Sequence, residues 1–100
     1  MARLTITAHA LADLQEIHSH IAQDKPEAAR RFTLRLRAKV RQVAETPGMG
    51  RSREDLRPGL FSFPIGQYLL FYRAQPGGLV LVRVLHGRGD LPALFRTTEF

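Results

Sequence analysis

The residues best suited to chemistry stand at the end of an apolar stretch near the C-terminus. Residues 79–85 are apolar apart from Arg83, and residues 86–90 read His-Gly-Arg-Gly-Asp. The apolar stretch is typical of a buried strand. A histidine can transfer protons near neutral pH, and an arginine binds phosphate or carboxylate groups. Charge at the end of a core strand is unfavourable unless it is paired, so this cluster indicates a partner site or a site of chemistry.

Two interpretations of this cluster are open from the sequence. His86 and Arg88 could contact a partner directly, or His86 could hold the following turn through hydrogen bonds to the backbone. Asp90 could pair with Arg83 or Arg88 and serve structure alone. Arg83 itself is expected to face a partner, because it interrupts an otherwise apolar run.

A second group of arginines lies on a helix predicted over residues 26–45. Arg30, Arg37 and Arg41 share its polar face, and Leu34 lies among them. Such a stripe is typical of the solvated face of an amphipathic helix. A leucine exposed among arginines also suits an acidic protein partner, so we expect these four residues to contact one.

The charge of the chain points to an anionic partner. The net charge of the 100 residues is +6, and residues 30–57 carry nine basic and three acidic side chains. Thirteen of the fifteen basic residues are arginines, which bind carboxylates and phosphates in a bidentate manner. Nucleic acid or an acidic protein would both satisfy this charge. The sequence contains no strong direct nucleic-acid-binding motif.

Several other classes of site find no support in the sequence. The chain has no cysteine and therefore no disulfide framework or thiolate metal site. His18 and His20 are two residues apart on a predicted helix and point to different sides, so we expect no metal site there. The sequence has no phosphate-binding loop or nucleotide fingerprint, and we expect no cofactor. No apolar stretch is long enough to span a membrane, so we expect a cytoplasmic protein without a membrane partner.

The predicted elements follow the order β-α-α-β-β-β. Thr7 can cap the first helix, and Pro26 suits the first turn of the second helix. Asp13 and Glu16 are predicted to lie off the apolar stripe of the first helix. The elements are expected at residues 3–7 (strand), 8–24 and 26–45 (helices), and 60–65, 67–74 and 79–86 (strands).

This order predicts a single α+β domain over residues 1–100, in which a helical hairpin packs on a small, mainly antiparallel sheet. The other face of the sheet is expected to have no cover. Residues 51–58 are polar and are predicted to be an irregular surface segment, and residues 90–95 a short turn or helix. The last ten residues are expected to form a tail.

Ordered motifs extend along almost the whole chain and resemble the ParE branch of the ParE/RelE superfamily of bacterial toxins. The last ten residues lie outside the resemblance. The motifs are Ala12-Asp13-Leu14 with Ile17, Pro26 with Ala28-Ala29, Pro47-Gly48-Met49-Gly50, residues 55–60, residues 66–73 and residues 82–90.

The resemblance implies the toxin of a type II toxin–antitoxin system. It implies that the toxin inhibits DNA gyrase by binding to it rather than by catalytic turnover. It also implies a role in plasmid stabilisation. It also implies a hetero-oligomer with a ParD-like, ribbon-helix-helix antitoxin that neutralises the toxin with an acidic, amphipathic segment. The residues expected to bind partners are Arg30, Leu34, Arg37, Arg41, Arg57, Arg73, Arg83, His86 and Arg88.

The alternative is a RelE-like, ribosome-dependent mRNA endoribonuclease. Cleavage through the 2′-hydroxyl needs a general base, a general acid and cations for the developing charge. If the chain were a nuclease, these groups would come from His86, Arg83, Arg73 and Arg57. RelE-like nucleases typically add a tyrosine or histidine near the C-terminal end of the sheet, but here no tyrosine follows His86. We therefore expect no catalytic residue and no enzymatic activity.

Overall fold

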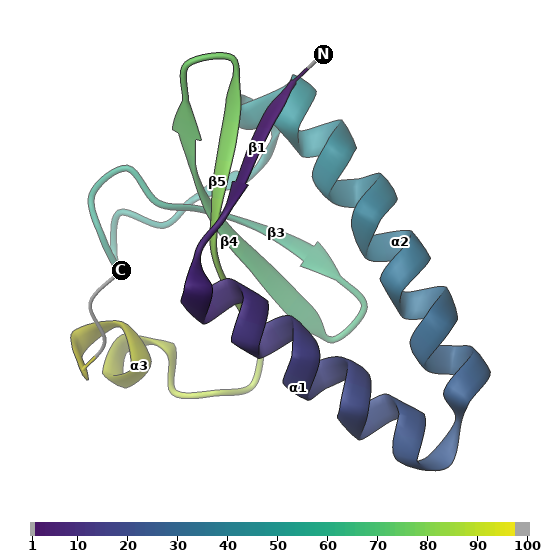
Figure 1. Ribbon diagram of the computed structural model, residues 1–100. Helices are drawn as coiled ribbons and strands as arrows, with labels where there is room; N and C mark the ends of the chain where they lie inside the picture. The colour runs from purple at the N-terminus through teal and green to yellow at the C-terminus, as the bar shows by residue number, and fades with distance from the viewer. Residues whose placement is uncertain (1, 98–100) are drawn as a thin grey trace.

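Two long helices lie on one side of a five-stranded sheet, and a short third helix lies on the other side (Figure 1). The computed structural model describes residues 2–97. The predicted α+β fold with a helical hairpin is confirmed, the short turn or helix predicted at residues 90–95 is found as the helix α3, and β2 is an addition. The elements are β1 (Arg3–Ile6), α1 (Ala8–Asp24), α2 (Pro26–Glu45), the 3₁₀ turn η1 (Pro47–Met49), β2 (Arg51–Ser52), β3 (Phe61–Ile65), β4 (Tyr68–Gln75), β5 (Gly78–His86) and α3 (Leu91–Thr97).

The strand that the C-terminal motif predicts, β5, lies inside the sheet, between the edge strand β1 and β4. The strand order is β1-β5-β4-β3-β2, with β1 parallel to β5 and every other pair antiparallel. β1 is an edge strand whose Ile6 pairs with Leu81 of β5. Residues 51–58 are not wholly irregular as predicted, because Arg51 and Ser52 pair with β3.

The helical hairpin begins and ends at the predicted residues. The Thr7 hydroxyl accepts a hydrogen bond from the Ala10 amide at 3.1 Å, as an N-cap should. The same hydroxyl donates to the Val82 carbonyl at 2.8 Å, so it also joins the start of α1 to β5. Pro26 stands in the first turn of α2, where its missing N–H removes no helical hydrogen bond.

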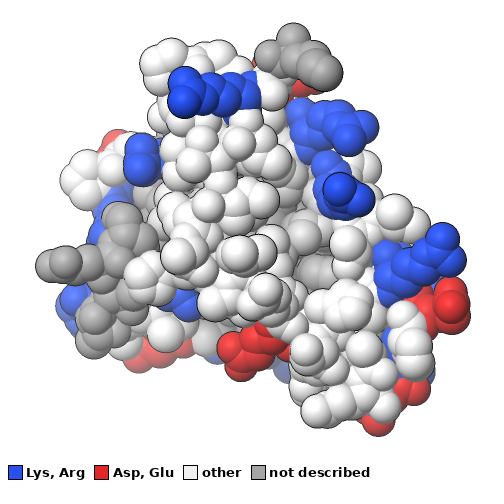
Figure 2. All heavy atoms as spheres, viewed as in Figure 1, with Lys and Arg blue, Asp and Glu red and all other residues white. Residues whose placement is uncertain are grey.

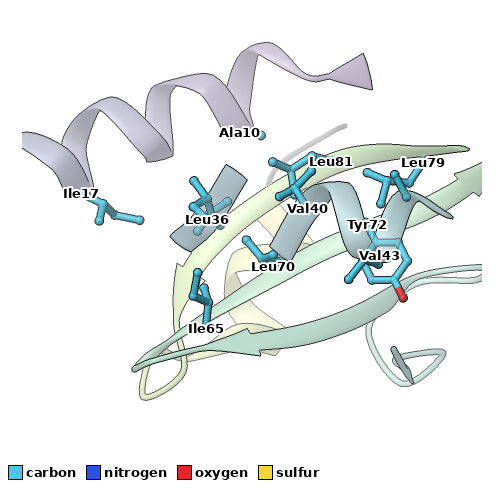
Figure 3. Close-up of a cluster of buried hydrophobic side chains, with 12 residues drawn as sticks. Ala10, Ile17, Leu36, Val40, Val43, Ile65, Leu70, Tyr72, Leu79 and Leu81 are labelled. Carbon is cyan, nitrogen blue, oxygen red and sulfur yellow. The ribbon is translucent and has the colours of Figure 1, made fainter. Parts of the chain in front are cut away.

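The main core lies between the hairpin and the sheet (Figure 3). Leu36, Val40 and Val43 of α2 recur at helical spacing and are buried, as the apolar periodicity predicts. They meet Leu70 and Leu81 from the sheet. On α1, Ala10 and Ile17 are buried, whereas Leu11 is 50% exposed.

A second, smaller core covers the opposite face of the sheet, which was predicted to be bare. Leu91 and Phe95 of α3 pack against Phe71 and Val80 of the sheet. The Phe71 and Phe95 rings meet edge to face at 4.9 Å between centroids. The prediction of a tail is therefore wrong for residues 91–97, and residues 98–100 lie outside the described part of the chain.

A β-bulge lies in the middle of β5. Phe71 pairs with Arg83 and Tyr72 pairs with Leu81, so Val82 is the extra residue of β5. A bulge changes the direction in which neighbouring side chains point. Val82 packs in the smaller core, whereas Arg83 reaches α1.

Candidate partner-binding sites

A groove of about 1000 Å³ lies between β1, α1 and α2. Leu4 and Ile6 of β1 line it and are 45% and 44% exposed, although their side chains are apolar. Leu14 of α1 and Phe32 and Val40 of α2 form further parts of its lining. Contiguous exposed apolar surface of this kind is typical of a binding site.

Positive charge borders this groove on the side of α2. Arg37 and Arg41 line it, and Glu45 is the acidic residue that lines it from the same helix. In Figure 2 the surface in the middle of the view is white, and Lys and Arg side chains stand in blue to its right, where α2 runs in Figure 1. Arg30 and Leu34, predicted to act with these arginines, are exposed on α2 outside the groove lining.

Arg83 is held inside the molecule by an ion pair. Its Nε and Nη2 atoms donate to the two carboxylate oxygens of Asp13 at 2.6 and 2.9 Å. The side chains of Arg83 and Asp13 are 13% and 11% exposed. Asp13 also accepts from the Val84 amide at 3.0 Å. The arginine in the apolar run is thus paired within the chain, which is how a largely buried charge is stabilised.

Two expectations about these charges are wrong. Asp13 was expected off the packed side of α1, and it lies against β5 instead. Asp13, not Asp90, pairs with Arg83, and Asp90 accepts a hydrogen bond from the Ala93 amide at the start of α3.

His86 holds the turn that follows β5. Its Nδ1 atom accepts from the Arg88 amide at 3.1 Å, so the neutral ring carries its proton on Nε2. That Nε2 atom lies 3.2 Å from the Gln67 side-chain oxygen and can donate to it. The ring also meets the Tyr68 ring edge to face at 5.4 Å between centroids. These contacts agree with the structural interpretation of His86, and Arg88 is exposed in the turn.

The four residues of the nuclease alternative do not all meet at one site, although Arg83 and His86 line one pocket together with Tyr68. Arg57 donates to the Phe95 carbonyl at 2.7 Å, beside α3, and Arg83 binds Asp13 of α1. Arg73 is exposed on β4. His86 pairs with Tyr68, five residues before Arg73 on the same strand. At 3.4 Å per residue this separation is about 17 Å along the strand.

Tyr72 of β4 is buried, and its hydroxyl is hydrogen-bonded. Its hydroxyl donates to the Pro47 carbonyl at 2.6 Å and accepts from the Gly50 amide at 3.0 Å. Burial raises the pKa of Tyr72 above its ordinary value of 10.0. A Cβ atom at Gly50 would overlap this hydroxyl, so glycine is needed there. The contact joins the end of α2 to the sheet and is structural.

In residues 2–97, no three His, Asp or Glu side chains form a group that could hold a metal ion. Over the same residues, none of the helices is long and apolar enough to cross a membrane.

The chain is similar to known proteins along most of its length. The chain is 36% identical over 86 residues to "Toxin RelE2" of Caulobacter vibrioides, and the aligned region covers 86% of this chain and 96% of that protein. It is 29% identical over 94 residues to "Toxin ParE3" of the same organism, covering 93% and 94% of the two chains.

A solved structure and a family profile complete the comparison. A chain of the "Chromosomal ParDE TA system from P. aeruginosa" has the same fold, with a TM-score of 0.72 at 21% identity, over 86% of this chain and 96% of that one. The family described as "ParE toxin of type II toxin-antitoxin system, parDE" matches residues 4–91. The chain therefore belongs to the ParE toxin family of type II toxin–antitoxin systems.

Proposed function

We propose that this toxin inhibits DNA gyrase by binding, without turnover, and that a ParD-like antitoxin neutralises it by occupying the groove between β1, α1 and α2. The observation that supports the antitoxin site is the groove itself. It exposes Leu4 and Ile6 beside Phe32 and has Arg37 and Arg41 on one side. An amphipathic segment with acidic side chains matches both features, since its apolar side would fill the groove and its carboxylates would meet the arginines.

The groove is large enough to receive several side chains of a protein segment. About 1000 Å³ is the upper end of the range for small-molecule pockets. The matched solved structure comes from a ParDE system, which supports a hetero-oligomer with a ribbon-helix-helix antitoxin for this chain as well.

The gyrase target is proposed because the four nuclease candidates do not all converge: Arg83 and His86 line one pocket, whereas Arg57 and Arg73 are not part of its lining. A general acid or base must come within about 3 Å of the proton that it transfers. His86 and Arg73 are about 17 Å apart along β4 at 3.4 Å per residue, so they cannot act on one phosphate. Relatives of this chain carry both ParE and RelE names, so names alone do not select the target.

The antitoxin site is tested by calorimetric titration of the purified toxin with the antitoxin encoded beside it. Arg37→Glu together with Arg41→Glu places like charge at the groove, and we expect affinity to fall at least tenfold. Arg31→Glu with Arg35→Glu is the matched control, because both residues are exposed on α2 outside the groove lining. Equal loss in the two variants would contradict the proposed site.

The target is tested with purified toxin in two assays. We expect the toxin to slow supercoiling by gyrase or to stabilise cleaved DNA, and we expect added antitoxin to abolish the effect. In the second assay, ribosomes translating a defined mRNA should leave the transcript intact. Cleavage that disappears in His86→Ala, with gyrase unaffected, would replace the proposal by the nuclease alternative.

A further inference from the structure

We infer that the uncovered part of the sheet face opposite the helical hairpin binds the phosphate backbone of duplex DNA. The surface consists of Arg3, Arg51 and Arg73, and we call it the arginine diagonal. The inference is independent of the proposed gyrase target, because it concerns contact between this chain alone and DNA.

The strand register places the three arginines on one face. Directly paired residues of neighbouring strands point to the same side of a sheet. Arg73 pairs with Val80, whose side chain packs in the small core under α3. Val80 also pairs with Thr5 of β1, and Arg3 is two residues from Thr5 on the same side.

Arg51 reaches the same face from the other edge of the sheet. It pairs with Ser62 of β3, and Ser62 pairs with Phe71 of β4. Phe71 lies in the small core under α3 and contacts the Phe95 ring. The face opposite the hairpin therefore carries an arginine on β2, on β4 and on β1.

The three positions form a straight diagonal across the sheet. Arg51 aligns with Phe71 of β4 by way of Ser62, and Arg73 is two residues further along β4. Gln75 is two residues beyond Arg73, and it aligns with Arg3 of β1 because both pair with Gly78 of β5. Each step crosses two strands and two residues, which is about 12 Å at strand spacings of 4.8 Å and 3.4 Å per residue. The whole diagonal is then about 23 Å long, which corresponds to roughly seven phosphates of one strand along the axis of B-DNA.

The charges of the diagonal are exposed, and the acidic groups beside them are already engaged. Arg3, Arg51 and Arg73 are exposed. Asp55 binds Arg53 at 3.2 Å, and this hydrogen bond lowers the pKa of the carboxyl, with a smaller contribution from Arg51. The Glu54 carboxylate accepts from the Gly59 amide at 3.2 Å.

The polarity of this surface favours DNA over a protein partner. Between the arginines lie Thr5 and Gln75, which are hydrogen-bonded to each other at 3.1 Å. The exposed apolar side chains of β1, Leu4 and Ile6, point instead into the groove on the hairpin side. Protein interfaces need apolar or aromatic anchors, whereas DNA interfaces are polar and strongly positive.

The test is fluorescence anisotropy of a labelled 20-base-pair duplex titrated with antitoxin-free toxin in 50–200 mM KCl. Three phosphate contacts predict that affinity falls about 40-fold over this range. Arg3→Gln, Arg51→Gln and Arg73→Gln combined should weaken binding at least tenfold at 50 mM KCl and remove most of the salt dependence. The matched control removes three positive charges from the hairpin through Lys25→Gln, Arg31→Gln and Arg35→Gln, and its affinity should stay within about twofold of the unmodified chain.

Thermal unfolding and antitoxin binding of both triple variants serve as the folding controls. Three outcomes would overturn the inference: no binding at 50 mM KCl, equal losses in the two triple variants, or tighter binding of single-stranded RNA of the same length than of the duplex. None of these depends on gyrase, so a failure of the proposed target and a failure of DNA binding are separately visible.

Discussion

The two faces of the sheet differ in what covers them and in what they leave exposed. On one face α1 and α2 bury the main core and leave an apolar groove beside β1. On the other face the seven-residue α3 covers a smaller core, and the uncovered part presents Arg3, Arg51 and Arg73. A strand alternates its side chains between faces, so β1 supplies Leu4 and Ile6 to one surface and Arg3 and Thr5 to the other.

This difference shows how a small sheet can serve two kinds of partner. The groove exposes apolar surface, and burying this surface away from water is favourable, which suits an apolar protein segment. In the described part of the chain, the opposite face presents exposed arginines with little exposed apolar area, which suits phosphate. The five experiments below test this contrast, beginning with the largest expected effect.

Asp13→Ala should produce the largest loss of stability, because it removes the ion pair that joins α1 to β5. It leaves the largely buried Arg83 charge without this carboxylate and removes the acceptor of the Val84 amide. We expect the free energy of unfolding to fall by about 3–5 kcal/mol, measured by urea denaturation. Asp13→Leu combined with Arg83→Met should lose less than Asp13→Ala alone. A double variant that is less stable than the single one would show that the charges act mainly through other contacts.

Phe95→Ala tests how firmly α3 covers the second face. Phe95 is 3% exposed and meets Phe71 edge to face. We expect a loss of about 3 kcal/mol in urea denaturation, from lost burial and the cavity left behind. Hydrogen exchange in α3 should become faster than in α1. If stability fell by less than about 1 kcal/mol, α3 would be a loosely attached segment and this face would be largely open.

Ile6→Asp separates the two surfaces directly. Ile6 is 44% exposed at the groove, so the chain should still fold, but an added carboxylate would meet the apolar, acidic antitoxin segment. We expect antitoxin affinity to fall about 100-fold, or about 2.7 kcal/mol at 1.36 kcal/mol per tenfold, while DNA affinity falls little. The triple variant of the arginine diagonal should behave in the opposite way. Parallel losses of both affinities in either variant would refute two separate surfaces.

Tyr72→Phe removes one hydroxyl from the hairpin side of the sheet. We expect a loss of about 1–2 kcal/mol at pH 7, because the Pro47 carbonyl and Gly50 amide lose their partner. Burial raises the pKa of Tyr72 above 10.0, so the hydroxyl is neutral in both states below pH 10. Above pH 10 the unfolded chain loses this proton first, and stability should fall as the pH rises towards the folded pKa. Urea denaturation between pH 8 and 11 should show a shallower decline for Tyr72→Phe, and an unchanged decline would assign it to other groups.

Asp55→Asn should have the smallest effect. Both of its carboxylate oxygens accept from Arg53 at 3.2 Å, but the Asp55 side chain is 62% exposed. The pKa of Asp55 is lowered chiefly by the hydrogen bond from Arg53, so any stabilisation is present at pH 7 and is lost as the pH falls through the folded value. Water screens such a pair, and we expect no measurable change in the urea midpoint at pH 7. A clear destabilisation would mean that this pair supports the face of the arginine diagonal.

The local elements were predictable because their signals are local. Thr7 and Pro26 mark the starts of the two long helices, and both occupy the predicted cap and first-turn positions. The alternation of residues 3–6 predicted a strand, but no local pattern states that β1 pairs in parallel with β5. β2 was missed because two residues are too few to show a period.

The tertiary contacts of charged residues were not predictable in the same way. Asp13 lies beside apolar positions of α1, and only the bulge at Val82 brings Arg83 within reach of it. The charge in the apolar strand was interpreted as facing a binding partner, but its counter-charge is Asp13, 70 residues away in the same chain. The packing of α3 on the second face of the sheet was not predicted. The spacing of Leu91 and Phe95 indicates an apolar side of a helix but does not indicate which surface that side contacts.

The pairing of β1 with β5 also sets the order in which the toxin can be assembled during synthesis. β1 is an edge strand that pairs with β5, so Ile6 has no partner strand until Leu81 has been made. Contacts this distant in sequence form late in folding. The groove includes Leu4, Ile6 and Leu81 together, so a nascent chain lacks the groove until nearly all of residues 1–86 have been translated. An antitoxin that recognises this groove would therefore meet its toxin only after the ribosome has finished β5.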